Sequence, residues 1–365
     1  MDIKKVRKKI PMQPEQRQLL EELEQLIYQS IPQVDKFLWH QLGVQIEEKN
    51  IIGIGLSYCG LRSLPETFFS ICLLQKLDLT YNQLMNLPDS FGQLQSLQEL
   101  LLHDNKLTTL PESFGNLQSL RILGICYNQL MKLPDSFGQL QSLQELYLWG
   151  NQLMSLPESF GNLKSLQKLD LGSNQLTTLP DSFGQLQSLQ ELNLAPNQLT
   201  TLPESFGQLQ SLQKLGLGVN TVKKFPESFS NLELLQELDL SDNEIATLPD
   251  SFGQMRSLRT LDLKNNQLRE LPESFGQLQS LQTLNITGNR LRNLPESFGH
   301  LSSLQTLSIS GNHQTTLPRS FANLKSIQKV NILNDFWFTH DKSAWDIFHG
   351  LEERGVKIVR LSTIR

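Results

Sequence analysis

Asparagine recurs every 23 residues along most of this 365-residue chain, without a change of phase. The apolar residues around it recur at fixed offsets as well, and a period of this length predicts an architecture in which each repeat stacks on its neighbours. The asparagines are Asn82, Asn105, Asn128, Asn151, Asn174, Asn197, Asn220, Asn243, Asn266, Asn289 and Asn312. In one repeat the frame comprises Leu97, Leu100, Leu102, Asn105, Leu107, Leu110, Phe114 and Leu117.

Each repeat combines two kinds of segment. A Leu-x-Leu stretch, such as Leu100 to Leu102, alternates as a strand should, and the Leu-Pro-Asp/Glu-Ser-Phe-Gly stretch after it suits a turn with a short helical or 3-10 piece. Parallel strands stand about 4.8 Å apart, and the outer segments need more room, so the array must curve with its strands inside. This pattern resembles the leucine-rich repeat signature. It predicts an α/β fold: a right-handed leucine-rich repeat solenoid (horseshoe) with a concave parallel β-sheet and short helical or 3-10 convex segments.

The repeated asparagine should belong to the interior between neighbouring repeats. A buried amide without partners is costly, so we expect its side chain to bond backbone groups that the turn leaves free. Replacing an asparagine in the middle of the array should therefore cost more stability than replacing a neighbouring glutamine.

The amino-terminal segment departs from the repeat, as the cap of a solenoid must. We expect an N-terminal helical cap over 1–50, with an amphipathic helix over 14–29 and a second helix after Pro32. The second helix would place Val34, Phe37, Leu38 and Leu42 on one face.

The repeats should occupy 51–335, as about 12 full repeats and a partial one, with Cys59 at the first asparagine position. A C-terminal cap over 336–365 should then add a helix around Lys342 to Arg354 and a closing strand from Val356 to Leu361. Such a cap would cover the last open edge of the sheet.

Composition narrows the function classes. The net charge is only −5, so nothing favours nucleic acid or an anionic membrane along the whole chain. No apolar run reaches the length of a membrane-spanning helix, and the basic run Lys4 to Lys9 leads into Pro11, unlike a signal peptide. We expect that run to be a solvated tail. The odd number of cysteines also favours a cytoplasmic protein.

Variation between repeats is concentrated on the positions that should face the concave side. The outer segments are nearly copies of one another, whereas the residues four, two and one before each asparagine differ. In repeats one to five these positions gather aromatic side chains, which are typical of binding hot spots. We expect a partner-binding site made of Tyr58, Tyr81, Leu101, His103, Tyr127, Tyr147 and Trp149. The alternative is that the rings only stack on one another as cross-strand pairs.

A secondary polar patch occupies the same offsets in later repeats and comprises Asp239, Asp242, Asp262 and Lys264, with Ser241 and Asn265 beside them. Its carboxylates would suit a basic segment of a partner. The alternative is an ordinary solvated surface.

A catalytic function has little support in the sequence. His103 and Cys126 should be neighbours on adjacent strands, which is the arrangement of a nucleophile pair. A catalytic pair also needs an oriented base and an enclosed pocket, and no metal-ligand spacing accompanies it. We expect no enzyme activity, no metal and no cofactor, with an enzyme using His103 and Cys126 as a remote alternative.

The 23-residue unit with its Leu-Pro-x-Ser-Phe-Gly-x-Leu outer turn resembles the intracellular Ras-group class of leucine-rich repeat proteins over residues 51–335. The resemblance implies a cytosolic signalling scaffold that binds proteins, with a small GTPase or its regulator as partner class, and implies neither nucleic-acid binding nor membrane insertion. It transfers no binding residue. The leading hypothesis is a non-catalytic protein-interaction scaffold that uses its concave face, and the alternative is a regulatory or spacer subunit that uses the caps or the convex side.

Overall fold

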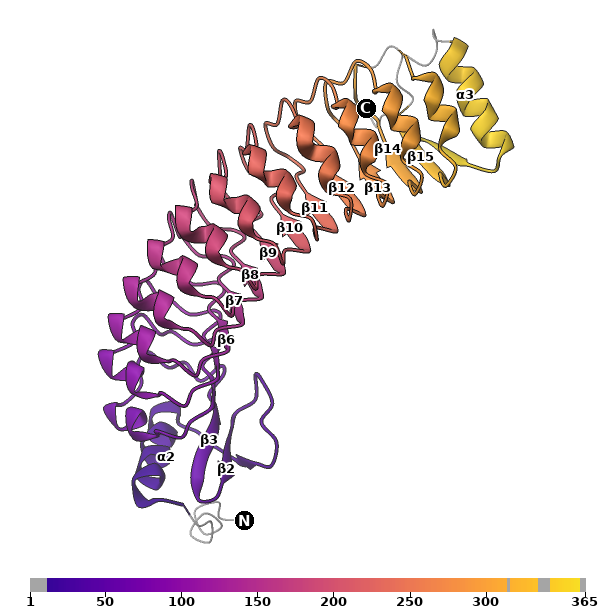
Figure 1. Ribbon diagram of the computed structural model, residues 1–365. Helices are drawn as coiled ribbons and strands as arrows, with labels where there is room; N and C mark the ends of the chain where they lie inside the picture. The colour runs from indigo at the N-terminus through magenta and orange to yellow at the C-terminus, as the bar shows by residue number, and fades with distance from the viewer. Residues whose placement is uncertain (1–11, 314–315, 334–341, 362–365) are drawn as a thin grey trace. The chain divides into compact units, whose positions relative to one another are not determined.

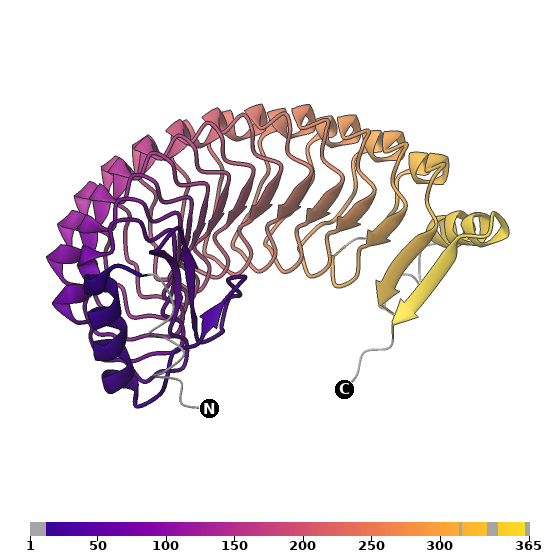
Figure 2. The ribbon, with the colours of Figure 1, turned by 90° about the horizontal axis from the view of Figure 1, so that it is seen from below.

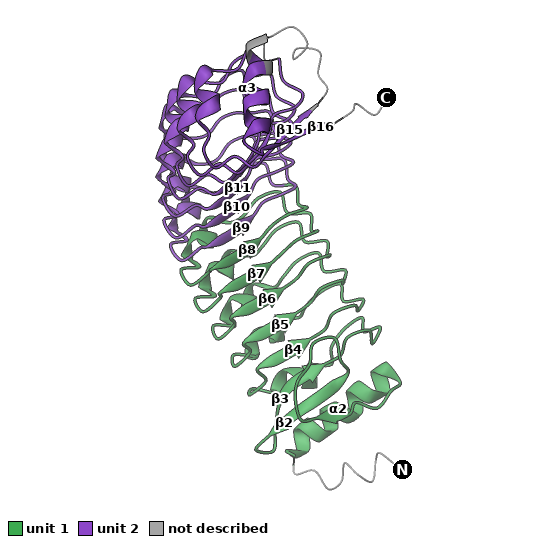
Figure 3. Ribbon diagram, turned by 90° about the vertical axis from the view of Figure 1, so that its right-hand side faces the viewer, with its two compact units in different colours: residues 1–175 green, residues 176–365 purple. Residues whose placement is uncertain are grey.

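The computed structural model describes residues 12–313, 316–333 and 342–361. These residues form two compact units, unit 1 over 1–175 and unit 2 over 176–365 (Figure 3). The basic run Lys4 to Lys9 and most of the link from the partial repeat to the C-terminal helix lie outside the described residues.

In unit 1, sheet neighbours follow sequence order, and all pairs are parallel except β2 with β3 (Figure 1). The helix is α2 (Pro14–Ile27), and the strands are β1 (Gln33–Val34), β2 (Gly43–Glu47), β3 (Asn50–Gly55), β4 (Lys76–Asp78), β5 (Glu99–Leu101), β6 (Ile122–Gly124), β7 (Glu145–Tyr147) and β8 (Lys168–Asp170). The 3-10 helices are η1 (Glu66–Ser70), η2 (Asp89–Gln93), η3 (Glu112–Asn116), η4 (Asp135–Gln139) and η5 (Glu158–Asn162).

In unit 2, all the strand pairs are parallel and again follow sequence order. Its strands are β9 (Glu191–Asn193), β10 (Lys214–Gly216), β11 (Glu237–Asp239), β12 (Thr260–Asp262), β13 (Thr283–Asn285), β14 (Thr306–Ser308), β15 (Lys329–Leu333) and β16 (Lys357–Leu361). Its helices are η6 (Asp181–Gln185), η7 (Glu204–Gln208), η8 (Glu227–Asn231), η9 (Asp250–Gln254), η10 (Glu273–Gln277), η11 (Glu296–His300), η12 (Arg319–Asn323) and α3 (Lys342–Glu353).

The predicted fold class is confirmed in both units. The strands form one row and the 3-10 helices the other, with the leucine frame between them (Figure 2). A proline in extended conformation precedes every 3-10 helix, because its fixed φ and missing N–H suit a helix start. The phenylalanines of successive 3-10 helices stack in the interior, as Phe114 does on Phe137 with centroids 6.2 Å apart. The exposed face of the strands is called the concave face below.

The asparagine side chains bridge neighbouring repeats, as the sequence predicts. Asn151 is 6% exposed; its Oδ1 accepts the Leu130 N–H at 3.0 Å, and its Nδ2 donates to the Ile125 and Leu148 carbonyl oxygens at 2.9 Å each. Two of those groups belong to the preceding repeat. One amide therefore satisfies backbone groups on both sides of a repeat boundary.

The prediction of a second helix after Pro32 is wrong. This segment contributes strand β1, a loop over residues 35–42 called the cap loop here, and strand β2, which turns back into β3 through Glu48 and Lys49 at φ 46° and 70°. Helical spacing of its apolar residues is coincidental, because contacts with other strands determine the conformation. A Cβ on Gly53 would lie 2.8 Å from the Phe37 ring, and one on Gly55 would meet the Gln41 carbonyl. Two glycines of β3 therefore let the cap loop approach the concave face.

The C-terminal helix and strand form as predicted, at Lys342–Glu353 and Lys357–Leu361. Strand β16 pairs with β15 in parallel, and Phe348 of α3 contacts Phe321 with ring centroids 6.0 Å apart. Arg354 donates to the Ala322 and Leu324 carbonyl oxygens at 2.7 Å each. These contacts attach the cap to the last 3-10 helix.

Candidate functional site

The residue just before the repeat asparagine adopts a left-handed backbone conformation in most repeats. Three of these residues in unit 1 are tyrosines: Tyr58, Tyr81 and Tyr127, at φ 60°, 55° and 54°. This conformation costs a bulky side chain on the order of 1 kcal/mol or more. In unit 2 the same position holds Asp242, Asn265 and Gly288, which adopt it more easily, and also Val219, a β-branched residue that does not. Three of the bulky residues at this position are therefore tyrosines of unit 1, at places where aspartate, asparagine or glycine would be less strained.

The rings of the predicted site form two separate contacts on the concave face. Tyr58 and Tyr81 stack with centroids 4.3 Å apart, and Tyr127 meets Trp149 edge to face at 4.7 Å. The exposed fractions of Tyr58, Tyr81 and Tyr127 are 66%, 42% and 54%, so stacking leaves much of each ring accessible. Tyr147 is half-buried, and its hydroxyl donates to Glu145 at 2.6 Å.

Leu101 and His103 meet between the two ring pairs. Both side chains lie over Gly124 on the next strand, where a Cβ would collide with the His103 ring and approach Leu101 Cδ2 to 2.8 Å. Nδ1 of His103 accepts the Cys126 backbone N–H at 3.0 Å. Burial lowers the pKa of His103, and this outweighs the opposing effect of Asp104 and Asp78. At neutral pH His103 is therefore uncharged, and its Nδ1 accepts a backbone hydrogen bond.

The cysteine of the remote enzyme hypothesis lacks the activation that a nucleophile needs. Burial raises the pKa of the Cys126 thiol to about 11, and Asp170 and Asp104 act in the same direction. A thiol of this pKa stays protonated at neutral pH. The described hydrogen bond between the pair runs from the Cys126 backbone to His103, so the arrangement does not support acid–base chemistry at sulfur. Among the described residues no group of His, Cys, Asp and Glu is arranged to hold a metal ion.

The cap loop adds a residue to the site that sequence reasoning missed. The added residue is His40, whose backbone N–H donates to Asp78 Oδ2 at 2.6 Å. The centroid of the His40 ring lies 6.5 Å from that of the Tyr81 ring. Asp78 is fully buried and also accepts the Thr80 N–H at 2.9 Å. The incorrect prediction of a helix after Pro32 gave no indication of this contact. A fully buried aspartate on a strand face with two backbone donors became visible only in the structure.

A further column of concave-face residues, six before each asparagine, was also missed. Lys76 pairs with Glu99 across β4 and β5, with 2.9 Å between Nζ and Oε1, and Glu145 binds Tyr147. The two-residue alternation of a strand places this column on the same face as the predicted site. The same alternation, extended from the position four before each asparagine to the position six before it, would have predicted this column.

The secondary polar patch lies on the concave face of unit 2. Asp239 and Asp262 are register partners on β11 and β12, and Asp242 accepts the Asn265 side-chain amide at 2.8 Å. Burial raises the pKa of Asp262, the neighbouring Asp239 adds to this, and hydrogen bonds from Lys264 and Asn285 oppose it. The residues of the patch lie together, but its carboxylates already accept hydrogen bonds from neighbouring residues of the chain, which are Ser241, Lys264, Asn265 and Asn285.

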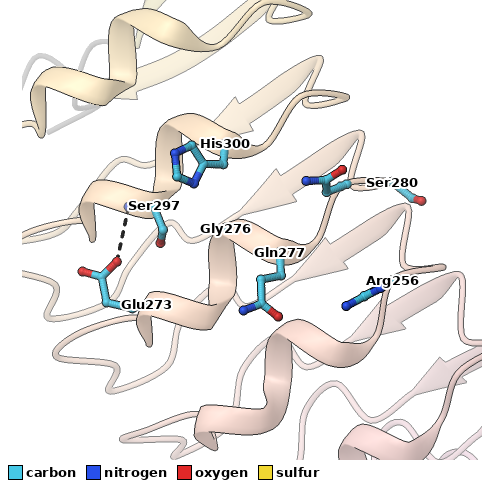
Figure 4. Close-up of a pocket in the computed structure, with 8 residues that line it drawn as sticks. Arg256, Glu273, Gly276, Gln277, Ser280, Ser297 and His300 are labelled. Carbon is cyan, nitrogen blue, oxygen red and sulfur yellow. Dashed lines mark hydrogen bonds between the residues drawn. The ribbon is translucent and has the colours of Figure 1, made fainter.

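A depression of about 500 Å³ lies among the 3-10 helices of unit 2, with no residue of the secondary polar patch in its lining. Its lining is polar, with Glu273 accepting the Ser297 N–H at 3.3 Å, and it includes Arg256 and His300 (Figure 4). The depression follows from the repeat geometry between neighbouring 3-10 helices. It contains no aromatic side chain that would suit a binding hot spot.

Comparison with known families agrees with the repeat geometry. A family model described as a leucine-rich repeat region matches residues 112–220 and 253–353, more than half of the chain. The chain belongs to the leucine-rich repeat family. Two other leucine-rich repeat models match 197–245, and 73–94 with 96–117. A search of the curated proteins found no match.

Several solved leucine-rich repeat structures resemble this one. The Leptospira interrogans protein LIC12759 is 34% identical, with a TM-score of 0.55, over 84% of this chain and 94% of that chain. YopM, an effector of Yersinia pestis, is 30% identical, with a TM-score of 0.61, over 78% and 72%. The Arabidopsis thaliana receptor ectodomain GASSHO1/SCHENGEN3 is 28% identical, with a TM-score of 0.65, over 86% and 47%, so the chain spans about half of it.

Leucine-rich repeat folds generally serve as protein-interaction scaffolds, and this family assignment does not support the enzyme alternative. Within the described parts of the chain, no helix is long and apolar enough to cross a bilayer.

Proposed function

We propose that this protein is a non-catalytic interaction scaffold that binds a protein partner through the aromatic concave face of repeats one to five. The observation that carries the proposal is the series of tyrosines held in the left-handed conformation, exposed by 42% to 66%. Strained residues that a fold does not need often mark functional sites. Tyrosine and tryptophan also supply large contact areas at binding hot spots.

Solved relatives support the class of partner. The structure of GASSHO1/SCHENGEN3 is a complex with CASPARIAN STRIP INTEGRITY FACTOR 2, and that of PEPR1 is a complex with AtPEP1. We extend polypeptide binding of this kind to the present chain.

The proposal includes a finer assignment. On the resemblance of its 23-residue repeat, we place the chain in the Ras-group class of cytoplasmic signalling scaffolds, with a small GTPase or its regulator as the first partner to test. The free thiols of Cys59, Cys72 and Cys126 fit a reducing compartment.

The test is a quantitative capture of partners from an extract of the cells that make the protein. The variant carries Tyr81→Asn, Tyr127→Asn, Tyr147→Thr and Trp149→Thr, because asparagine tolerates the left-handed conformation and threonine suits a strand. A matched control variant carries Asp239→Asn, Asp242→Asn, Asp262→Asn and Lys264→Gln on the concave face of unit 2. Unfolding midpoints establish first that both variants are folded.

We expect the wild type and the control to retain the same partner and the aromatic variant to lose it. Retention by all three chains would contradict the proposal and favour a spacer that uses its caps or convex side. Loss by the control alone would move the site to the secondary polar patch. A retained partner that is neither a GTPase nor a GTPase regulator would remove only the Ras-group assignment.

A further inference from the structure

Asp104 interrupts the row of tyrosines on the concave face. Backbone hydrogen bonds join the row from strand to strand. The Tyr81 N–H donates to the His103 carbonyl oxygen at 2.9 Å, and the Asp104 N–H donates to the Cys126 carbonyl oxygen at 3.0 Å. The Tyr127 N–H donates to the Trp149 carbonyl oxygen at 2.8 Å. Asp104 therefore stands one strand from each tyrosine and shares their left-handed conformation, at φ 53°. Its carboxylate is partly exposed.

The neighbouring rings form contacts on the far sides of Asp104. Tyr81 stacks on Tyr58, and Tyr127 meets Trp149, whereas the described residues include no ring contact between Tyr81 and Tyr127. Two strand spacings, about 10 Å, separate the backbones of these two tyrosines. Asp104 therefore stands one strand spacing, about 5 Å, from the backbone of each tyrosine. A cation held by its carboxylate would lie beside both tyrosines, and an aromatic face attracts a cation within roughly 6 Å of its ring centroid.

No cation of the described chain neutralises Asp104. Its carboxylate has no hydrogen bond or ion pair among the described residues. Lys76 is paired with Glu99, and Lys106, two residues further along, makes no ion pair with Asp104 within 4.0 Å. His103 stays neutral, because burial lowers its pKa and its Nδ1 accepts a backbone hydrogen bond. The pKa of Tyr81 is raised first by its hydrogen bond with Tyr58, in which the Tyr81 hydroxyl donates, and then by the negative charge of Asp104.

We infer that the space above Asp104, between Tyr81 and Tyr127, is the binding site for an arginine side chain of the protein partner. This inference rests on the proposed function and names the group that the concave face recognises. A guanidinium forms paired hydrogen bonds with a carboxylate and stacks on aromatic rings, whereas an ammonium offers only a point charge. The hydroxyl-bearing rings and the carboxylate therefore fit arginine better than lysine.

The test selects short random peptides on the full chain and compares three targets. Asp104→Asn removes the charge but keeps the shape, and asparagine tolerates the left-handed conformation. Asp242→Asn is the matched control, since Asp242 occupies the same repeat position at φ 54° in unit 2. The four-residue aromatic variant shows which peptides bind the aromatic face. The best wild-type peptide is then remade with citrulline, a neutral isostere, or lysine in place of its arginine.

We expect wild type and Asp242→Asn to select peptides with an arginine at one shared position. Asp104→Asn and the citrulline peptide should each weaken binding by about tenfold or more, as the loss of a charge-assisted hydrogen bond implies, and lysine should weaken it less. Peptides that need the aromatic residues but show no preference for arginine, or bind Asp104→Asn equally well, would overturn this inference and leave the proposed function intact. A selection that yields no peptide dependent on the aromatic residues would count against both.

Discussion

The asparagine of each repeat is the residue on which the array most depends. Replacing Asn151 by alanine should cost about 2 to 4 kcal/mol of unfolding free energy, because it leaves the Leu130 N–H and two carbonyl oxygens without partners in the interior. Gln152→Ala is the control, since that side chain is exposed in the next position and should change stability by less than about 0.5 kcal/mol. Urea denaturation of both variants measures the difference. Equal losses of unfolding free energy in the two variants would show that the Asn151 amide does not stabilise the contact between neighbouring repeats.

His103 makes a prediction about pH at the same scale. Its pKa is lowered in the folded protein, so the unfolded chain takes up the proton first as the pH falls below about 6.5. The contribution of a neutral His103 is therefore fully present above that pH and declines below it. Between about pH 7.5 and about pH 5.5, the wild type should lose more unfolding free energy than His103→Gln. His300→Gln, which changes an exposed histidine, should behave as the wild type; a loss in His103→Gln as large as in the wild type would contradict the assignment.

Among the structural elements, the cap loop depends on one buried carboxylate. Asp78→Asn replaces the oxygen that accepts the His40 N–H by a donor, so the loop should detach, with a loss of about 1 to 3 kcal/mol. Amide exchange at His40 should become faster. Asp239→Asn is the matched control, because Asp239 stands at the same repeat position and likewise accepts a backbone N–H, from Ser241 at 2.9 Å, but meets no cap loop. If both variants lose the same stability, Asp78 does not hold the loop.

The strands and 3-10 helices could be predicted because their determinants repeat. Alternating leucines, a proline and a phenylalanine recur at fixed offsets, so the same strand and 3-10 helix are predicted independently in each repeat. The cap loop occurs once, and it is held by a bond between residues 38 positions apart. Apolar spacing after Pro32 matched a helix by chance, and only the contact with Asp78 and the glycines of β3 decides the conformation.

At the scale of the whole molecule, the sequence located the candidate surface but not its internal arrangement. The positions of Tyr58, Tyr81, Tyr127 and Trp149 on one face follow from the repeat. Their division into two ring pairs depends on side-chain rotamers and on a left-handed backbone position, neither of which a period of 23 residues encodes. The contribution of His40 depends on a cap outside the repeats. These details distinguish one leucine-rich repeat protein from another with the same frame.

The most direct test of the account is an amide hydrogen-exchange footprint of the protein with and without its captured partner. We predict slower exchange on binding in the strand-end segments 56–58, 79–81, 102–104, 125–127 and 147–150, and unchanged exchange in the 3-10 helices η1 to η5. Slower exchange confined to those 3-10 helices or to α2 would contradict the account, because the partner would then bind the opposite side or the cap.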